Sequence, residues 1–280
     1  MKSRLTRKAL RSGRGLGRVL ILMGITLPAL CTSLPPAPVY TAQGIVNAVT
    51  QTATALAPNS LATIYGTYLA FNTSAAESVP GSVLPSTING VSVLVEGQYA
   101  HLLYISPSQI NFLIPYNLVA GTVTVEVARL GLAGPSVKIQ LHSTAPSLFP
   151  WNGNFAIAAH LSGALISPDA PAKSGEIILL YVAGLGRVTP DTTSGRLESS
   201  AFRITAAADL KVLLGGKAVA AANVLYAGLA PGFAGLYQVN LRLPDDLAAN
   251  PEIRISVGTE ISAPNLLLPA VASPAVIAVP

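Results

Sequence analysis

The chain has 280 residues, of which 51% are hydrophobic and only 10% are charged, and its formal net charge is +5. An average soluble protein carries about 25% charged residues, and long amphipathic helices need charge on their outer faces, so a helical bundle is disfavoured. Seven of the 17 basic residues lie within the first 18 positions, which leaves ten basic against twelve acidic residues in the remainder. That faintly acidic remainder disfavours nucleic acid as a partner.

The N-terminal region combines three features of an export signal. Its basic residues are followed by an apolar run over 19–27, and small residues come after Pro28. This order is typical of a secretory signal peptide, and the run is short for a membrane span, which needs about 20 residues. We expect a signal peptide over residues 1–33, with an uncleaved anchor or acylation at Cys31 as alternatives.

Cysteine usage agrees with export. Cys31 is the only cysteine of the chain, so a protein cleaved after it has no disulfide and is held together by burial alone. We expect an extracytoplasmic location, meaning secreted, periplasmic or on the cell surface, with membrane contact only through the N-terminal signal or anchor.

The next stretch predicts many short strands. Residues 34–56 begin with prolines and small residues, which indicates a linker and lead-in. Residues 57–147 then hold about seven short apolar segments with turns every 8–12 residues, the pattern of an immunoglobulin-like β-sandwich. Within 121–129, Val123, Val125 and Val127 alternate with polar residues, as expected of a strand with one buried face.

The second part of the chain echoes the first. Residues 102–115 and 224–244 each contain a Leu-Tyr pair, a loop and a Gln-x-Asn motif that opens an apolar strand ending at proline. The matching residues are Tyr104, Gln109 and Asn111 in one copy, and Tyr226, Gln238 and Asn240 in the other. We therefore predict an all-β fold of two tandem immunoglobulin-like sandwiches, over residues 57–147 and 171–280. An inter-domain segment, 148–170, separates them, and 266–271 is the expected last strand.

Four stretches carry a resemblance to a known family. They are APNSLATIYGTYLA, INGVSVLVEGQYAHLLYISPSQINFLIPY, PAKSGEIILLYVAGLG and VLYAGLAPGFAGLYQVNLRLP, in this order. The chain resembles the uncharacterised Solibacter-type C-terminal domain family of secreted acidobacterial proteins, and its two sandwich openings are similar to IPT/TIG immunoglobulin-like domains. The resemblance implies a secreted protein and no catalytic residue. Unlike family members that follow other modules, this pair of domains is expected directly after the signal.

The motifs of catalysis and metal binding are missing or weak. The sequence has no Gly-x-Ser-x-Gly elbow, no HExxH and no cysteine pair, the patterns of common hydrolases and zinc sites. His101, His142 and His160 are the only candidate bases. Residues 191–195 with Glu198 faintly resemble a calcium loop but lack its repeated Asp or Asn. We expect no enzyme activity, no catalytic residue, no metal and no cofactor.

Exposed aromatic side chains are the candidates for binding a partner. Trp151 is the first, and its alternative role is to fill the junction between the sandwiches. The Gly/Pro-rich loop 228–235 offers Pro231, Gly232 and Phe233, and its alternative role is to fold back as a cap on the core of the second sandwich. Tyr68 and Phe71 are weaker candidates.

These observations predict a non-catalytic extracytoplasmic binding or adhesion module whose partner is a protein or a glycan at the cell surface. Two alternatives stay open. One is an envelope-associated hydrolase or the accessory domain of an enzyme, and the other is a structural spacer.

Overall fold

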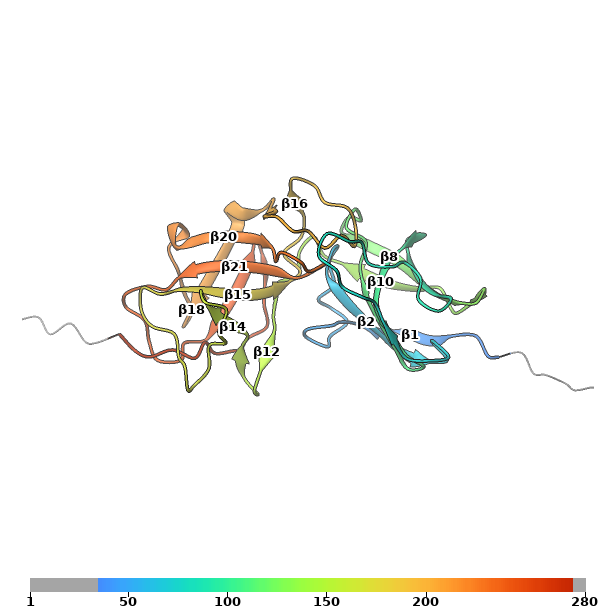
Figure 1. Cartoon of the computed structure of the whole chain (residues 1–280), viewed down its shortest axis with the longest axis horizontal. Helices are drawn as coiled ribbons and strands as arrows, with labels where there is room; N and C mark the ends of the chain where they lie inside the picture. Colours follow the sequence, from blue (N-terminus) through green and yellow to red (C-terminus); the bar gives the residue numbers. More distant parts are fainter. Residues whose placement is uncertain (1–34, 274–280) are drawn as a thin grey trace, which may run out of the picture. The chain divides into compact units, whose positions relative to one another are not determined.

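The computed structural model describes residues 35–273, and this part of the chain is built from β-strands (Figure 1). The exceptions to strand and loop within it are two short 3₁₀ turns, Ala207–Asp209 and Ala221–Asn223. The all-β prediction is confirmed. Within residues 35–273, no helix is long and apolar enough to cross a membrane. The expected signal peptide lies outside the described residues.

Residues 36–141, here called the first half, form two sheets. One has the order β1 (Val39–Asn47), β2 (Leu61–Thr67), β7 (Gln109–Leu113), β6 (His101–Ile105) and β3 (Ser74–Ala75). The other has the order β10 (Val137–Leu141), β8 (Gly121–Arg129), β4 (Val91–Val95) and β5 (Gln98–Tyr99), and β9 (Leu132–Ala133) pairs with β8. Every pairing is antiparallel. The alternation in β8 buries its three valines as expected, and they join one hydrophobic core cluster.

Residues 147–273, the second half, repeat the plan. One sheet has the order β11 (Ser147–Leu148), β15 (Ile177–Ala183), β21 (Tyr237–Arg242), β20 (Val224–Leu229), β17 (Arg203–Ile204) and β16 (Val188–Thr189), and β14 (Ala158–His160) also pairs with β15. The other has the order β19 (Lys217–Ala218), β18 (Leu210–Leu214), β22 (Ile253–Val257) and β23 (Glu260–Ile261). A hairpin of β12 (Pro150–Trp151) and β13 (Phe155–Ala156) stands apart. In Figure 1, β15, β20 and β21 lie side by side.

The internal echo in the sequence corresponds to matching registers. Tyr104 pairs with Asn111 in the first half, and Tyr226 pairs with Asn240 in the second. A register shift stands directly before each tyrosine, so even the bulge is repeated. In both copies the Gln side chain donates to the Asn side chain two residues later, at 2.8 Å in the first half and 2.7 Å in the second.

Two segments expected to be connections contribute strands. β1 lies within the expected linker 34–56 and is hydrogen-bonded to β2. In the second half, β11 and β14 both pair with β15, and the hairpin β12–β13 is inserted between them. The expected inter-domain segment 148–170 therefore holds sheet strands. The expected last strand, 266–271, is instead an irregular segment in which Leu266 and Leu268 hydrogen-bond beside β22.

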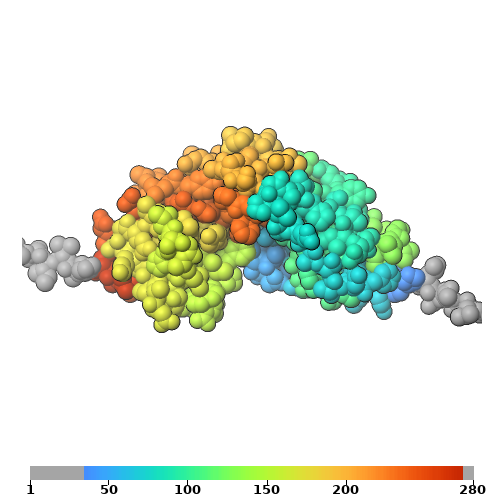
Figure 2. Space-filling model, viewed as in Figure 1, coloured from blue at the N-terminus to red at the C-terminus, as the bar shows by residue number. Residues whose placement is uncertain are grey.

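The two halves have separate hydrophobic cores, yet they are not independent. Tyr116 follows β7 of the first half, but it is 3% exposed and belongs to the core cluster of the second half. Backbone hydrogen bonds join the loop at 81–84 to the loop at 195–197, and these cyan and yellow-orange stretches adjoin in Figure 2. Residues from Pro36 onward form one compact unit, and the division into two domains stays a prediction.

Candidate binding pockets

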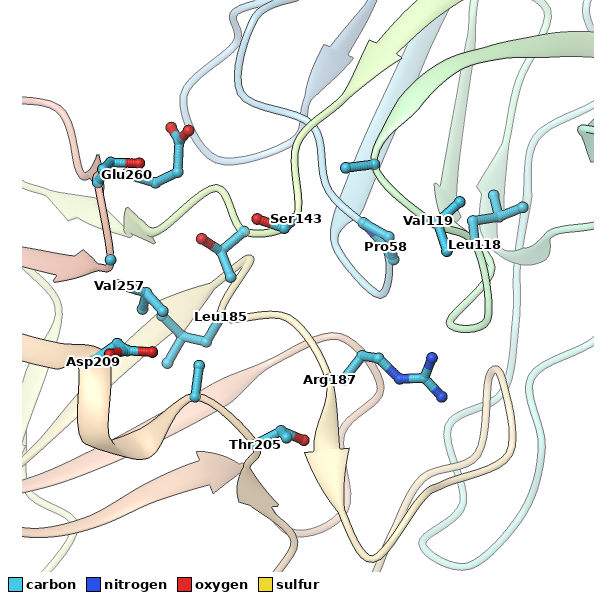
Figure 3. A pocket seen from close by; sticks show the side chains of 15 residues that line it. Pro58, Leu118, Val119, Ser143, Leu185, Arg187, Thr205, Asp209, Val257 and Glu260 are labelled. Carbon is cyan, nitrogen blue, oxygen red and sulfur yellow. The ribbon is translucent and has the colours of Figure 1, made fainter.

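A pocket of about 690 Å³ lies where the two halves meet (Figure 3). We call it the junction pocket. Its first-half wall comes from Pro58 and residues 118–120, and its second-half wall comes from residues around Leu185, Asp209 and 257–260. Residues 142–146, here called the connector, join the halves and supply Ser143 and Thr144. Each half therefore provides only part of the lining.

The lining of the junction pocket mixes aliphatic, hydroxyl and charged groups. Its largest apolar side chains are those of Leu118, Leu185 and Val257, and its hydroxyls are those of Ser143, Thr144, Thr205 and Thr259. Arg187 of the loop before β16, Asp209 of a 3₁₀ turn and Glu260 of β23 bring the charges, and Figure 3 shows their positions around the pocket. Such a lining can hold a ligand through apolar contact and fix its orientation with a few polar groups.

Arg187 is held in place by neighbours from both halves. Its Nη2 lies 3.4 Å from Oδ1 of Asp191, and its guanidinium carbon lies 5.2 Å from the centre of the Tyr116 ring. The Tyr116 hydroxyl first, and the Asp191 carboxylate second, raise the pKa of Arg187 above its ordinary value. The same tyrosine hydroxyl holds the pKa of Asp191 below its usual range. Arg187 is therefore a fixed positive charge at the pocket.

Tyr116 anchors this cluster. Its hydroxyl donates to Asp191 at 2.9 Å and accepts from the backbone N–H of Val188 at 3.1 Å. Its own backbone N–H donates to Oγ of Ser194 at 3.3 Å. Burial raises the pKa of Tyr116, so the hydroxyl stays neutral and available as a donor. A residue of the first half thus orders the loop of the second half that carries Arg187.

A second set of hydrogen bonds connects the two halves beside those of Tyr116. The side chain of Asn59 donates to the hydroxyl of Tyr237 at 2.8 Å. That hydroxyl donates in turn to the backbone oxygen of Gly186, next to Arg187. Burial raises the pKa of Tyr237, as expected for a phenol with no access to water. Together the two tyrosines connect the halves through buried hydrogen bonds.

A further pocket, of about 450 Å³, borders the junction pocket. We call it the proline pocket, because Pro146, Pro150 and Pro264 line it. Its other apolar lining is aliphatic, and Thr50, Thr52, Thr54 and Ser147 add hydroxyls. Glu260 lines both pockets, and its Oε1 lies 3.4 Å from Nδ1 of His142. The pair joins the connector to β23 of the second half.

The residues expected to bind a partner lie elsewhere. Trp151 is half-buried on β12 and pairs with Phe155, which in turn bridges to Leu267. Phe233 is 55% exposed and lines a smaller apolar pocket of about 220 Å³. Pro231 and Gly232 share its turn, in which Gly232 donates to the backbone oxygen of Glu198 at 2.6 Å. None of these four residues lines the junction pocket, and their binding role stays a prediction.

The loop 228–235 contacts both halves, and its Leu229, at the end of β20, is buried in the core of the second half. A β-carbon on Gly235 would overlap the side chain of Leu113 and crowd that of Leu61, both in the first half. The loop therefore packs across the junction rather than only over the core of its own half. Phe233 and Ala234 of the loop also line a small pocket together with Leu61, Leu84 and Leu103 of the first half.

The three histidines lie apart, and each contacts an oxygen of its own. Nδ1 of His101 lies 2.6 Å from the backbone oxygen of Leu84. His142 is paired with Glu260, and Nδ1 of His160 lies 2.5 Å from Oε1 of Glu176. The hydrogen bond from Glu176 is the main cause that raises the pKa of His160.

The weak calcium motif has other partners in the structure. Asp191 binds the Tyr116 hydroxyl, and the carboxylate of Glu198 accepts a hydrogen bond from the hydroxyl of Thr192. Within residues 35–273, no group of three or more His, Cys, Asp or Glu side chains is placed to hold a metal ion.

Sequence reasoning missed the residues that line the junction pocket. Arg187 and Glu260 belong to none of the sequence motifs described above. Tyr116 follows Pro115 and resembled the end of a strand. One sequence feature could have indicated the junction. Tyr116 and Tyr237 have no equivalent tyrosine in the other copy of the repeat, so the sheet structure that the two copies share does not explain them.

Comparisons with known proteins find only remote structural similarity. No family model and no curated protein matches the chain, so the Solibacter-type resemblance stays a prediction. Solved structures that match include a surface glycan-binding protein from Prevotella bryantii, at 13% identity over 79% of this chain and 40% of that one, with a TM-score of 0.25. A Bacteroides ovatus SGBP-B in complex with mixed-linkage heptasaccharide matches at 12% identity, over 71% of this chain and 35% of that one, with a TM-score of 0.28.

Domains 5–6 of the S-layer protein SbsC match at 11% identity over 85% of this chain and all of that one, with a TM-score of 0.26. The chain spans about half or less of the length of the first three glycan-binding proteins it matches. At these identities and TM-scores the likeness does not identify a ligand for this chain.

Proposed function

We propose that the chain is a non-catalytic binding module of the extracytoplasmic surface, and that its ligand is held in the junction pocket. The observation that carries this proposal is that Arg187, Asp209 and Glu260 all line one hollow between the halves. Those three side chains come from separate segments, so only the assembled molecule brings them together. The location rests on the basic and apolar N-terminal sequence.

The chemistry of the pocket suits recognition of a polar ligand with apolar parts. Arg187 can donate to an acceptor on the ligand while it keeps its contact with Asp191. Asp209 and Glu260 can accept from ligand hydroxyl or amide groups, and Leu185 and Val257 provide apolar contact. Because Tyr116 and Tyr237 fix the walls through buried hydrogen bonds, the pocket is ordered before the ligand arrives, which reduces the entropic cost of binding.

The test is a screen of the exported protein on glycan and peptide arrays, followed by solution titration of the hits. We expect Arg187→Ala and Asp209→Asn to weaken a true ligand about tenfold or more each, as loss of a charged contact would. Arg242→Ala and Asp245→Asn are matched controls, because both residues are exposed and outside the pocket lining. Melting curves establish that all four variants fold.

Two results would contradict the proposal. If hits bind the junction variants as tightly as the controls, the ligand does not occupy this pocket. If a bound ligand is converted into a product, the protein is an enzyme. Failure of every array to yield a specific ligand would instead favour the structural spacer.

A further inference from the structure

Three chain segments supply residues to both pockets. The connector between the halves contributes Ser143 and Thr144 to the junction pocket, and it contributes His142, Ala145 and Pro146 to the proline pocket. Residues 257–260 line the first and 260–266 line the second. The loop before β2 contributes Pro58 to the first and Thr50, Thr52, Thr54 and Ala55 to the second. Because Glu260 lines both pockets and three segments supply residues to each, the two pockets adjoin, and we treat them as the two ends of one groove.

Glu260 and His142 stand at the point where the pockets meet. Their side chains are 40% and 39% exposed, and the contact between them is 3.4 Å long. A pair this exposed contributes little to stability, so a ligand can replace or share its hydrogen bonds at small cost. A ligand that occupies both pockets can therefore displace this pair or hydrogen-bond to it.

The two ends of the groove differ in chemistry. At the junction end, Asp209 and Glu260 face the hollow, and the one cation of the lining, Arg187, is already paired with Asp191. This leaves an excess of negative charge, which favours a basic group on the ligand. At the proline end, the apolar lining consists of prolines and aliphatic side chains such as Leu148 and Leu266, which suit an aliphatic group.

The groove also borders an open sheet edge. β23 is the last strand of its sheet and pairs with β22 on one side. Its residues Glu260 and Ile261 line the groove. An edge strand offers backbone donors and acceptors to an extended chain. No Phe, Tyr or Trp side chain lines either pocket, and the one aromatic ring of the lining is the imidazole of His142, so a sugar ring would lack the broad apolar surface that those side chains supply.

We infer that the ligand is an extended polypeptide segment that crosses Glu260 and occupies both pockets, with a basic residue near Asp209 and an aliphatic residue near Leu148. This inference rests on the proposed function, because it names the ligand class for the same junction pocket. A linear chain suits the groove because successive side chains of an extended peptide alternate in direction, while its backbone follows the edge of β23.

The experiment selects binders from a random peptide library displayed on phage, with the exported protein as bait, and measures the affinities of the selected peptides. We expect selected sequences to place a basic residue a few positions away from an aliphatic residue. Removing either residue should weaken binding about tenfold. On the protein, Asp209→Asn should mainly affect peptides that contain the basic residue.

The proline end needs its own variant and control. Ala263→Trp places a bulky ring at an exposed position of the proline-pocket lining, and Ala249→Trp makes the same change at an exposed position outside both pockets. We expect only Ala263→Trp to weaken the peptide, again by about tenfold. Equal melting temperatures establish that neither variant disturbs folding.

The outcomes separate this inference from the proposed function. If a ligand is lost with Asp209→Asn but binds normally to Ala263→Trp, the extended ligand is refuted and the junction pocket remains. If glycans bind through both ends and no peptide does, the polypeptide is refuted. If no ligand responds to variants at either end, both proposals fail.

Discussion

Tyr116→Phe removes a single oxygen atom and leaves the aromatic ring in the core of the second half. The backbone N–H of Val188 loses the acceptor that it has at 3.1 Å, and Asp191 loses its donor at 2.9 Å. Val188 is 1% exposed, so its N–H would be left buried, at a cost of about 1–3 kcal/mol for an unsatisfied donor. We expect a loss of about 2 kcal/mol in the free energy of unfolding.

A loss of that size lowers the melting temperature by roughly 4–8 °C in a chain of this length. The assay is thermal and urea denaturation of the wild-type protein beside Tyr116→Phe. Tyr99→Phe is the control, because it makes the same chemical change on a side chain that is 58% exposed. The reasoning is refuted if Tyr116→Phe and Tyr99→Phe unfold alike, since the hydroxyl would then contribute nothing to the junction.

Other expectations follow from local contacts. Gly235 has a φ of +70° and lies against Leu113, so Gly235→Ala should lower the melting temperature clearly more than Gly153→Ala, where φ is also positive but space is open. Deleting residues 228–235 should destabilise the protein, because it removes the end of β20 with the buried Leu229 as well as the contacts of Gly235, and an unchanged melting temperature would contradict this packing. Because the pKa of His160 is raised by Glu176, its pairing stabilises the fold below the ordinary histidine pKa of 6.5, and this contribution is lost as pH rises through the raised pKa. The stability difference between wild type and His160→Gln, measured across this pH range, should shrink accordingly, and a constant difference would argue against the pair.

Much of the fold could be predicted from the sequence because strand patterns are local. The alternating valines of β8 identified its buried face before the structure did. The same pattern also shows where local reasoning stops. Arg129 continues the buried phase of β8 and is 1% exposed, with its guanidinium donating to the backbone oxygens of Tyr68 and Pro36. A charged side chain such as Arg129 is expected at the surface. Its burial is explained by the two backbone carbonyls, which come from distant parts of the sequence and lie next to the guanidinium in the folded protein.

The candidate site was harder to predict, since its residues are distant in the sequence. Arg187 lies in the loop before β16, Asp209 ends a 3₁₀ turn and Glu260 begins β23, and none of the three belongs to a recognisable motif. Aromatic residues drew attention instead, because exposed rings are a common feature of binding surfaces. The pocket depends on how one half meets the other, and a prediction of two independent sandwiches contains no information about that contact.

The internal repeat separates residues of the framework from residues of the junction. The two Gln-x-Asn motifs bond internally in the same way in both halves, so their repetition is explained by sheet structure. Tyr237 has no such copy, because the matching position beside β2 is Ser108, whose backbone oxygen accepts from Gly66. The hydroxyl of Tyr237 acts at the junction, where it accepts a hydrogen bond from the side chain of Asn59 in the first half. Tyr116 likewise enters the core of the second half. Both unrepeated tyrosines hydrogen-bond the loop that carries Arg187, so these two differences between the copies lie beside the pocket and are explained by the junction rather than by the sheet structure that the copies share.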